Sequence, residues 1–172
     1  MLSTLPVAMW GLLGAAAATE GPTVTQLDGH RVRGTIEVDA ALETVRAVLS
    51  DPRRIARIDN SGTTVTLKGR DGACLLTHSA VAHPIASIEY VTRVCPIHDG
   101  FKSTLHQSND LTDFESIWRM RERGSRTIVE YEIVTIPDLP IPQFIVDRQT
   151  RSAVASLLLK LQTHFGSKPS PP

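Results

Sequence analysis

Six segments of strand length follow one another through the middle of the chain, separated only by short turns. Turn-forming residues bound them, such as Asn60-Ser61-Gly62 before the first and Arg123-Gly124-Ser125 before the last. Consecutive strands with short connections pair antiparallel, because a parallel pair needs a long crossover. The six segments are residues 63–69, 73–81, 86–94, 101–108, 114–121 and 127–136. They predict an antiparallel meander.

One long helix is predicted after the meander, over residues 143–165. The Pro-rich segment at residues 137–142 precedes it, and proline continues neither a strand nor a helix. Apolar side chains then recur at helical spacing, with charged residues away from them. This apolar stripe consists of Val146, Thr150, Val154, Leu157, Leu158, Leu161 and Phe165.

Three shorter elements are predicted ahead of the meander. Residues 32–38 alternate like a strand, and residues 40–49 and 52–58 are predicted as short helices. Asp39 is expected to cap the first helix and Asp51 the second. Residues 24–30 are expected to be an irregular lead-in.

The order of elements indicates an α+β fold. One face of the sheet and one stripe of the long helix must each be buried, and packing one on the other satisfies both. We therefore expect a curved antiparallel sheet of about seven strands around the C-terminal helix. A length of 172 residues with 41% hydrophobic residues suits a single domain, assigned to residues 24–166. Residues 167–172 are Pro-rich and predicted to form a disordered tail.

The first residues of the chain resemble an export signal. Residues 5–18 are apolar and uncharged, and they end in small residues with a polar segment after them. Residues 1–18 are therefore predicted to be a signal peptide, which implies a periplasmic or secreted protein. The segment before the apolar run carries no Lys or Arg, so a buried N-terminal helix and a retained anchor stay open as alternatives.

Cys74 and Cys95 are the two cysteines of the chain. An exported protein can form a disulfide from such a pair, and a bond between them would be intramolecular. Two buried free thiols are the alternative. Their spacing matches no zinc or redox motif.

Charge and motifs exclude several classes of function. Eighteen basic residues balance eighteen acidic ones without forming a basic run, so nucleic acid is not expected as a partner. The sequence contains no nucleophile motif, phosphate-binding loop or zinc spacing. His78 and His83 lie five residues apart, but Pro84 and strand geometry argue against joint ligation of a metal ion. No catalytic residue, metal ion or cofactor is predicted.

Alternation along the strands predicts which side chains face inward. The charged side of each strand should be solvated, because unpaired buried charge is costly. The opposite side combines large apolar residues with uncharged polar ones, which is typical of a small-molecule cavity. The predicted ligand-binding residues on the strands are Tyr90, Thr92, Ser103, Leu105, Gln107, Ser116, Trp118, Met120, Tyr131 and Ile133. Val154, Leu157, Leu158 and Leu161 of the long helix should form the opposite wall. The alternative is that the hydroxyl groups bond to the backbone and no cavity exists.

The sequence resembles the START-like superfamily (SRPBCC), the Bet v 1-like group of polyketide cyclase and lipid-transport proteins. Residues 34–40 (GTIEVDA) and 48–52 (VLSDP) carry this resemblance around the first predicted helix, and residues 127–131 (TIVEY) and the Leu139-Pro140 turn carry it near the end. It implies a helix-grip fold with a cavity for a hydrophobic small molecule: a lipid, sterol, quinone or polyketide. It supplies no catalytic residue.

Three hypotheses about function follow. The first is an exported carrier for a lipid-like or other hydrophobic molecule, with transient membrane contact through the segment that holds Leu139 and Ile141. The second is a polyketide cyclase-like enzyme that uses the same cavity. The third is an envelope interaction protein whose core is filled by its own side chains.

Overall fold

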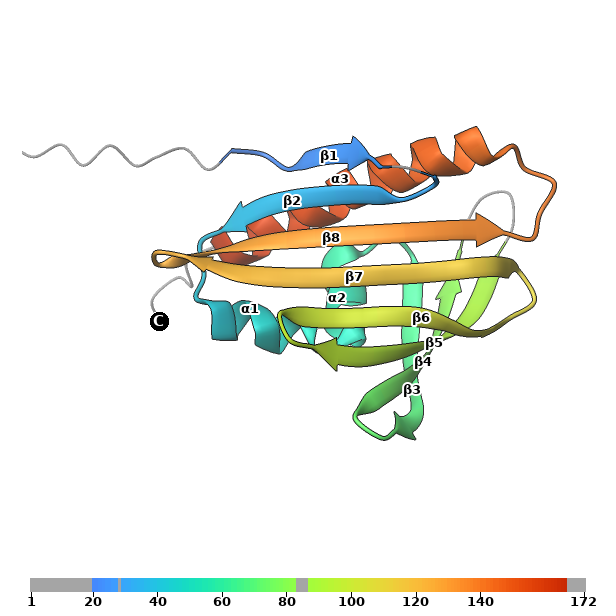
Figure 1. Ribbon diagram of the computed structural model, residues 1–172, viewed down its shortest axis with the longest axis horizontal. Helices are drawn as coiled ribbons and strands as arrows, with labels where there is room; N and C mark the ends of the chain where they lie inside the picture. The colour runs from blue at the N-terminus through green and yellow to red at the C-terminus, as the bar shows by residue number, and fades with distance from the viewer. Residues whose placement is uncertain (1–19, 28, 83–86, 167–172) are drawn as a thin grey trace, which may run out of the picture.

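The computed structural model describes residues 20–27, 29–82 and 87–166. These residues form one antiparallel sheet of eight strands in the order β1-β2-β8-β7-β6-β5-β4-β3, with three helices (Figure 1). The strands are β1 (Thr23–Gln26), β2 (Val32–Val38), β3 (Thr63–Asp71), β4 (Cys74–Val81), β5 (Ile88–Ile97), β6 (Gly100–Ser108), β7 (Leu111–Arg123) and β8 (Arg126–Pro137). The helices are α1 (Leu42–Leu49), α2 (Pro52–Asp59) and α3 (Gln143–Gly166).

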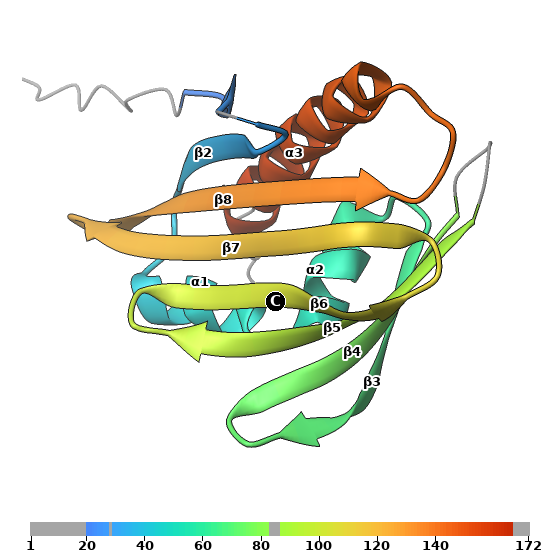
Figure 2. The same ribbon diagram turned by 45° about the vertical axis from the view of Figure 1, so that its right-hand side comes forward.

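The sheet curves around its helices, as Figure 2 shows. Helix α3 packs on β2 and also contacts β1 and β8, whereas α2 lies between α3 and β3. The α+β helix-grip fold predicted from the sequence is thus confirmed. No helix in the described ranges has an apolar stretch long enough to cross a bilayer. The predicted signal peptide and tail lie outside the described residues, as do His83 and Pro84.

Two expectations about the start of the domain are wrong. Residues 24–30 were expected to be irregular, but β1 pairs with β2 from Thr23 opposite Thr35 onward. Four mostly exposed residues alternate too briefly to reveal this edge strand in the sequence. Asp39 does not cap α1, because the helix begins at Leu42 and its N-cap residue is Ala41. The predicted cap of α2 is confirmed, since Asp51 Oδ1 accepts a hydrogen bond from the Arg53 backbone N–H at 3.0 Å.

The core lies where α3 meets β2. Val154, Leu158 and Leu161 of the helix are fully buried there. Gly34 of β2 makes this close packing possible, because a Cβ at that position would lie 2.5 Å from Leu158 Cδ1 and 2.6 Å from Val154 Cγ1. This close approach determines which part of α3 is packed against the sheet.

The charged side chains of the strands are expected to be solvated on the outer face of the sheet. Glu132 is an exception. The Glu132 side chain is only 7% exposed. Its carboxylate accepts hydrogen bonds from Arg33 and Arg119, and Arg31 lies 3.7 Å away. Burial of this charge is tolerated because it is paired with three guanidinium groups.

Cys74 and Cys95 form a disulfide between β4 and β5. Leu75 and Val94 are paired in the register of these strands, so the two cysteines come next to each other at the end of the ladder. Of the two alternatives left by the sequence, the structure contains the intramolecular bond. Val94 lines the cavity between the sheet and the helices, and strand alternation directs its neighbour Cys95 to the other face.

Candidate functional site

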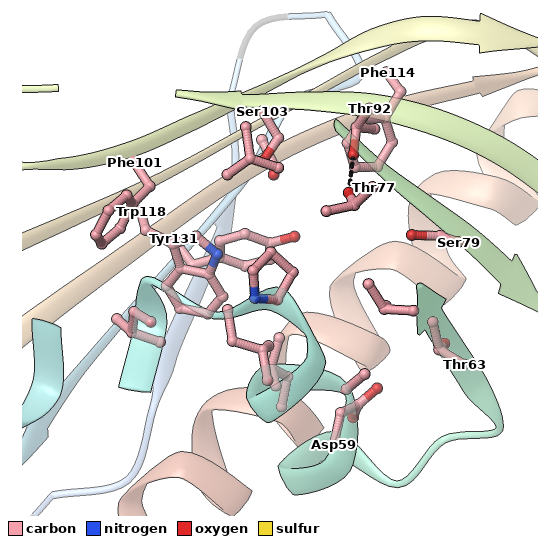
Figure 3. Close-up of a pocket in the computed structure, with 18 of the residues that line it drawn as sticks. Asp59, Thr63, Thr77, Ser79, Thr92, Phe101, Ser103, Phe114, Trp118 and Tyr131 are labelled. Carbon is pink, nitrogen blue, oxygen red and sulfur yellow. Dashed lines mark hydrogen bonds between the residues drawn. The ribbon is translucent and has the colours of Figure 1, made fainter. Parts of the chain in front are cut away.

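A cavity of about 160 Å³ lies between the sheet, α2 and α3 (Figure 3). Its helical wall is apolar apart from Asp59 and consists of Leu49, Pro52, Ile55, Ala56, Asp59 and Leu157. Its sheet wall draws residues from six strands: Thr63, Val65, Thr77, Ser79, Tyr90, Thr92, Val94, Phe101, Ser103, Phe114, Ser116, Trp118 and Tyr131. The size is close to that of an engineered cavity of about 150 Å³ that admits one benzene molecule.

Aromatic side chains form two groups on the sheet wall. The Trp118 and Tyr131 rings come from opposite positions on β7 and β8 and are stacked with their centroids 4.0 Å apart. Tyr90 and Phe114 form a second, tilted pair at 5.0 Å. These rings offer a large apolar surface at small conformational cost, and the tyrosines add hydroxyl groups. The arrangement suits a flat or ring-shaped ligand.

Hydroxyl groups line most of the rest of the sheet wall, beside Val65 and Val94. The Thr77 and Thr92 side chains of β4 and β5 hydrogen-bond each other at 2.9 Å, as Figure 3 shows. Tyr90 bonds Ser79, and Tyr131 bonds Ser116. In the described part of the chain, every buried side-chain polar atom has a hydrogen-bond partner. Hydroxyl oxygens can accept a further bond, so this wall can receive the polar group of a ligand while staying satisfied without one.

Asp59 is the single residue with a formal charge among those that line the cavity. It is the last residue of α2 and lies on the opposite side from Phe101 and Trp118 in the view of Figure 3. Its Oδ1 lies 3.1 Å from Lys160 Nζ of α3, and the same ammonium group donates to the Asp59 main-chain oxygen. Ser61 donates to Oδ2. The cavity therefore has an aromatic end and an acidic end.

Burial raises the pKa of both cavity tyrosines above the ordinary value of about 10. For Tyr131, Tyr90 raises the pKa further and the hydrogen bond with Ser116 opposes the shift. For Tyr90, the hydrogen bond with Ser79 opposes it. The phenols are therefore held neutral in the folded protein, as expected in a wall of low polarity.

An alkaline titration should report this environment directly, since the chain has no other tyrosines. The folded state keeps both phenols protonated where the unfolded chain ionises, so their contribution to stability is complete below about pH 10 and is lost as the pH rises above it. We expect phenolate absorbance to appear only together with the loss of native circular dichroism. Phenolate that titrates near pH 10 in a fully native protein would contradict the buried positions of Tyr90 and Tyr131.

The structure brings seven of the fourteen predicted ligand-binding residues together around the cavity. They are Tyr90, Thr92, Ser103, Ser116, Trp118, Tyr131 and Leu157. All but Leu157 belong to strands whose alternation placed their uncharged side inward.

The other seven lie elsewhere. Met120, Val154, Leu158 and Leu161 belong to the packed core where α3 meets the sheet, with Ile133 against it. Leu105 is half-buried and Gln107 is exposed. The register shift between Val91 and Thr92 leaves His106 without a partner, so Val91 pairs with Gln107 and Thr92 with Leu105. This β-bulge turns Gln107 away from the cavity side, which simple alternation cannot foresee.

Sequence reasoning missed the contribution of α2 and of the β3–β4 hairpin. Ile55 and Asp59 line the cavity from the helix, and Thr77 and Ser79 line it from β4. The alternation of Thr77 and Ser79 with His78 was a usable signal. The positions on α2 depend on how a short helix packs between α3 and β3, which no local pattern encodes.

Histidine and acidic side chains do not assemble into a metal site within the described ranges. His78 projects from β4 toward Glu89, with 3.3 Å between Nε2 and Oε2. His30 contacts Asp147 of α3 at 3.1 Å. Both pairs lie apart from the cavity walls described above.

Comparison with known proteins shows which solved structures share this fold. The sequence matches no family model, and no curated protein matches it. A START superfamily protein from Mycobacterium smegmatis superposes with a TM-score of 0.70 at 20% identity, covering 80% of this chain and 97% of that one. A STAR-related lipid transfer protein from Xanthomonas axonopodis superposes with a TM-score of 0.63 at 15% identity, covering 85% and 93%.

A third solved structure, an aromatase/cyclase from a Streptomyces species, superposes with a TM-score of 0.62 at 13% identity, covering 79% of this chain and 96% of that one. At these identities the likeness concerns the fold. The chain has the START-like helix-grip fold that the resemblance implied, and such a fold hosts more than one function.

Proposed function

We propose that the protein is an exported carrier that holds a hydrophobic small molecule between the sheet and helices α2 and α3. The observation that carries the proposal is the cavity itself, with stacked aromatic rings and hydroxyl groups on its sheet wall and an almost wholly apolar helical wall opposite. Apolar walls with a few polar points are the usual construction of a small-molecule site. One structural neighbour is a STAR-related lipid transfer protein, which supports a hydrophobic, lipid-like ligand. The proposal also includes sterols, quinones and polyketides, which are hydrophobic as well.

The cavity volume limits what is enclosed. About 160 Å³ accommodates one ring or a short apolar segment, and sites for larger ligands span roughly 300–1,000 Å³. A longer ligand would therefore extend out of the cavity or require the helices to move away from the sheet. The same space counts against the alternative of an interaction protein with a completely filled core.

A cyclase-like enzyme is the second candidate. One structural neighbour is an aromatase/cyclase, and the Tyr90 and Tyr131 hydroxyls lie in the cavity wall. A neutral phenol can donate a proton or a hydrogen bond to a carbonyl-containing ligand. Turnover of a bound polyketide-like compound, followed by mass spectrometry, would favour this candidate over the carrier.

Transient membrane contact is part of the carrier proposal. Phe144, in the first turn of α3, is 71% exposed, and Arg148 and Arg151 follow at helical spacing and are also exposed. An exposed aromatic ring beside two cations complements an anionic lipid surface. Export itself is supported by the sequence of residues 1–18, which the structure does not describe.

Ligand binding is tested through Trp118. A Trp10→Phe variant leaves Trp118 as the one remaining tryptophan. Oleic acid, cholesterol, a short-chain quinone and a hydroxylated naphthalene are added, from solution and from anionic vesicles. We expect saturable changes in emission with at least one compound, and slower uptake from vesicles by a further Phe144→Ser variant.

Cavity-filling variants provide the control. Ser103→Leu places a larger side chain in the cavity and should weaken binding at least tenfold, whereas Ser152→Leu on the exposed side of α3 should leave affinity unchanged. Trp118→Ala is a poor test, because this buried residue also belongs to the core and its truncation costs about 3–5 kcal/mol. Unchanged emission with all four compounds, together with no co-purified ligand in native mass spectrometry, would refute the carrier proposal.

A further inference from the structure

The charges around the cavity discriminate between classes of ligand. The cavity lining includes the carboxylate of Asp59 and no lysine, arginine or histidine. Its remaining polar side-chain groups are hydroxyls and the Trp118 indole N–H, which are all neutral at physiological pH. A ligand with a negative head group would meet the Asp59 carboxylate, and the Lys160 ammonium beside it is already paired with that carboxylate, so binding of an anion is disfavoured.

The position of Asp59 shows that its charge is held in place. A carboxylate at the C-terminal end of a helix is disfavoured by the helix dipole, and Asp59 ends α2. Lys160 offsets this by bonding both Oδ1 and the main-chain oxygen, and Ser61 bonds Oδ2. Lys160 thereby ties α2 to α3 at the acidic end of the cavity.

The Asp59 carboxylate retains capacity for a ligand. An ionised carboxylate offers about four acceptor sites, and the contacts with Lys160 and Ser61 occupy two of them. The charge also acts across the cavity, since it contributes to the raised pKa of Tyr131. A donor group entering from the cavity can therefore bond to Asp59 without displacing Lys160.

The two ends of the cavity determine how a bound ring compound would be oriented. Trp118 and Phe101 lie on one side in Figure 3, and Asp59 and Thr63 on the other. A ring stacked near Trp118 would direct a substituent on its far side toward Asp59. The volume of about 160 Å³ limits the enclosed part to about one ring with a short substituent.

We propose that the cavity selects an uncharged ring compound with a hydroxyl group, which packs its ring near Trp118 and donates a hydrogen bond from its hydroxyl group to Asp59. This inference rests on the proposed ligand-binding function and narrows it to phenols and other cyclic alcohols. Fatty acids and other anionic amphiphiles are excluded as the enclosed part of the ligand.

Three probes built on the same ethyl-substituted ring test the proposal: 4-ethylphenol, ethylbenzene and 4-ethylbenzoate. They share one ring and one ethyl group and differ in a hydroxyl, a hydrogen or a carboxylate. Titrations at neutral pH follow Trp118 emission in the Trp10→Phe variant, with calorimetry as a second measurement. We expect 4-ethylphenol to bind about tenfold tighter than ethylbenzene, because its hydrogen bond is to a charged acceptor. 4-Ethylbenzoate should bind most weakly.

The Asp59→Asn variant tests whether Asp59 is responsible for the tighter binding of 4-ethylphenol. It should remove most of the advantage of 4-ethylphenol and improve binding of 4-ethylbenzoate by about tenfold or more, whereas Asp138→Asn at an exposed site should change neither. If Asp59→Asn does not fold, the order of affinities of the three probes for the protein with Asp59 intact still tests the proposal. Tightest binding of 4-ethylbenzoate, or equal binding of all three, would overturn the inference.

Failure of this inference and failure of the carrier proposal give different results. If ethylbenzene binds as well as 4-ethylphenol, the cavity holds ligands but Asp59 does not select them. If none of the three probes binds while a larger compound perturbs Trp118, the inferred ligand class is wrong and the carrier proposal stands. If neither the probes nor the larger compounds bind, the carrier proposal itself fails.

Discussion

Gly100→Ala should lower the free energy of unfolding by more than about 3 kcal/mol, beyond the usual range for an added methyl group. A Cβ at this position would lie 1.8 Å from the Trp118 main-chain oxygen, a contact that no side-chain rotation can relieve. Gly100 pairs with Arg119 at the start of β6, and the Asp99 carbonyl accepts a hydrogen bond from the Met120 N–H beside it. The variant must therefore separate β6 from β7.

Two other glycines form a graded control for this prediction. At Gly34 the added methyl group meets the ends of the Leu158 and Val154 side chains, which can shift slightly, so Gly34→Ala should cost about 1–3 kcal/mol. At Gly21 nothing lies within 4 Å, and Gly21→Ala should stay within about 0.5 kcal/mol of the parent. Urea unfolding followed by circular dichroism measures the free energy of unfolding of each variant and so gives their order of stability. Near-parental stability of Gly100→Ala would show that the β6–β7 contact is less close than described.

Gly100→Ala should also change the cavity. Phe101 follows Gly100 on β6 and pairs with Trp118 on β7, and both line the aromatic end of the cavity. A shift between these strands would separate the two side chains. We therefore expect any folded fraction of Gly100→Ala to lose the Trp118 emission response to ligands, while Gly21→Ala keeps it.

The fold was predictable because the residues that determine its elements lie close together in the sequence. Turn residues divide the strands, Asp51 caps α2 through its own side chain, and the stripe on α3 follows the helical period. Trp118 and Tyr131 were placed on the inward side by alternation alone, and the register then makes them direct partners. Short connections left little freedom in how consecutive strands pair.

The cavity was only partly predictable, because its limits depend on contacts between distant segments. Leu157 and Leu158 are neighbours on the same helix, yet Leu157 lines the cavity and Leu158 is packed against Gly34. Gln107 was misplaced by a single bulged residue, which changes the face of the strand without changing its composition. Asp59 lines the cavity at the end of α2, where it is bonded by Lys160, about a hundred residues later in the chain.

Loss of the Cys74–Cys95 disulfide should have the second large effect. The bond closes a segment with a sequence separation of 21, and the chain-entropy treatment assigns about 3 kcal/mol to a loop of this length. We expect Cys74→Ala/Cys95→Ala to lose about that amount in urea unfolding. The wild-type protein should lose a similar amount when a reductant is added, whereas the double variant should be insensitive to it.

The disulfide also stabilises one wall of the cavity. It joins β4 to β5 at the end of the ladder, and Thr77 of β4 bonds Thr92 of β5 across the same pair of strands. In the described sheet β3 is the edge strand and pairs with β4, so loosening β4 frees the whole β3–β4 hairpin that supplies Thr63 and Ser79. Reduction should therefore weaken ligand binding under conditions where circular dichroism still reports a folded protein. Equal stability and equal affinity with and without reductant would show that the remaining strand pairing alone holds this wall in place.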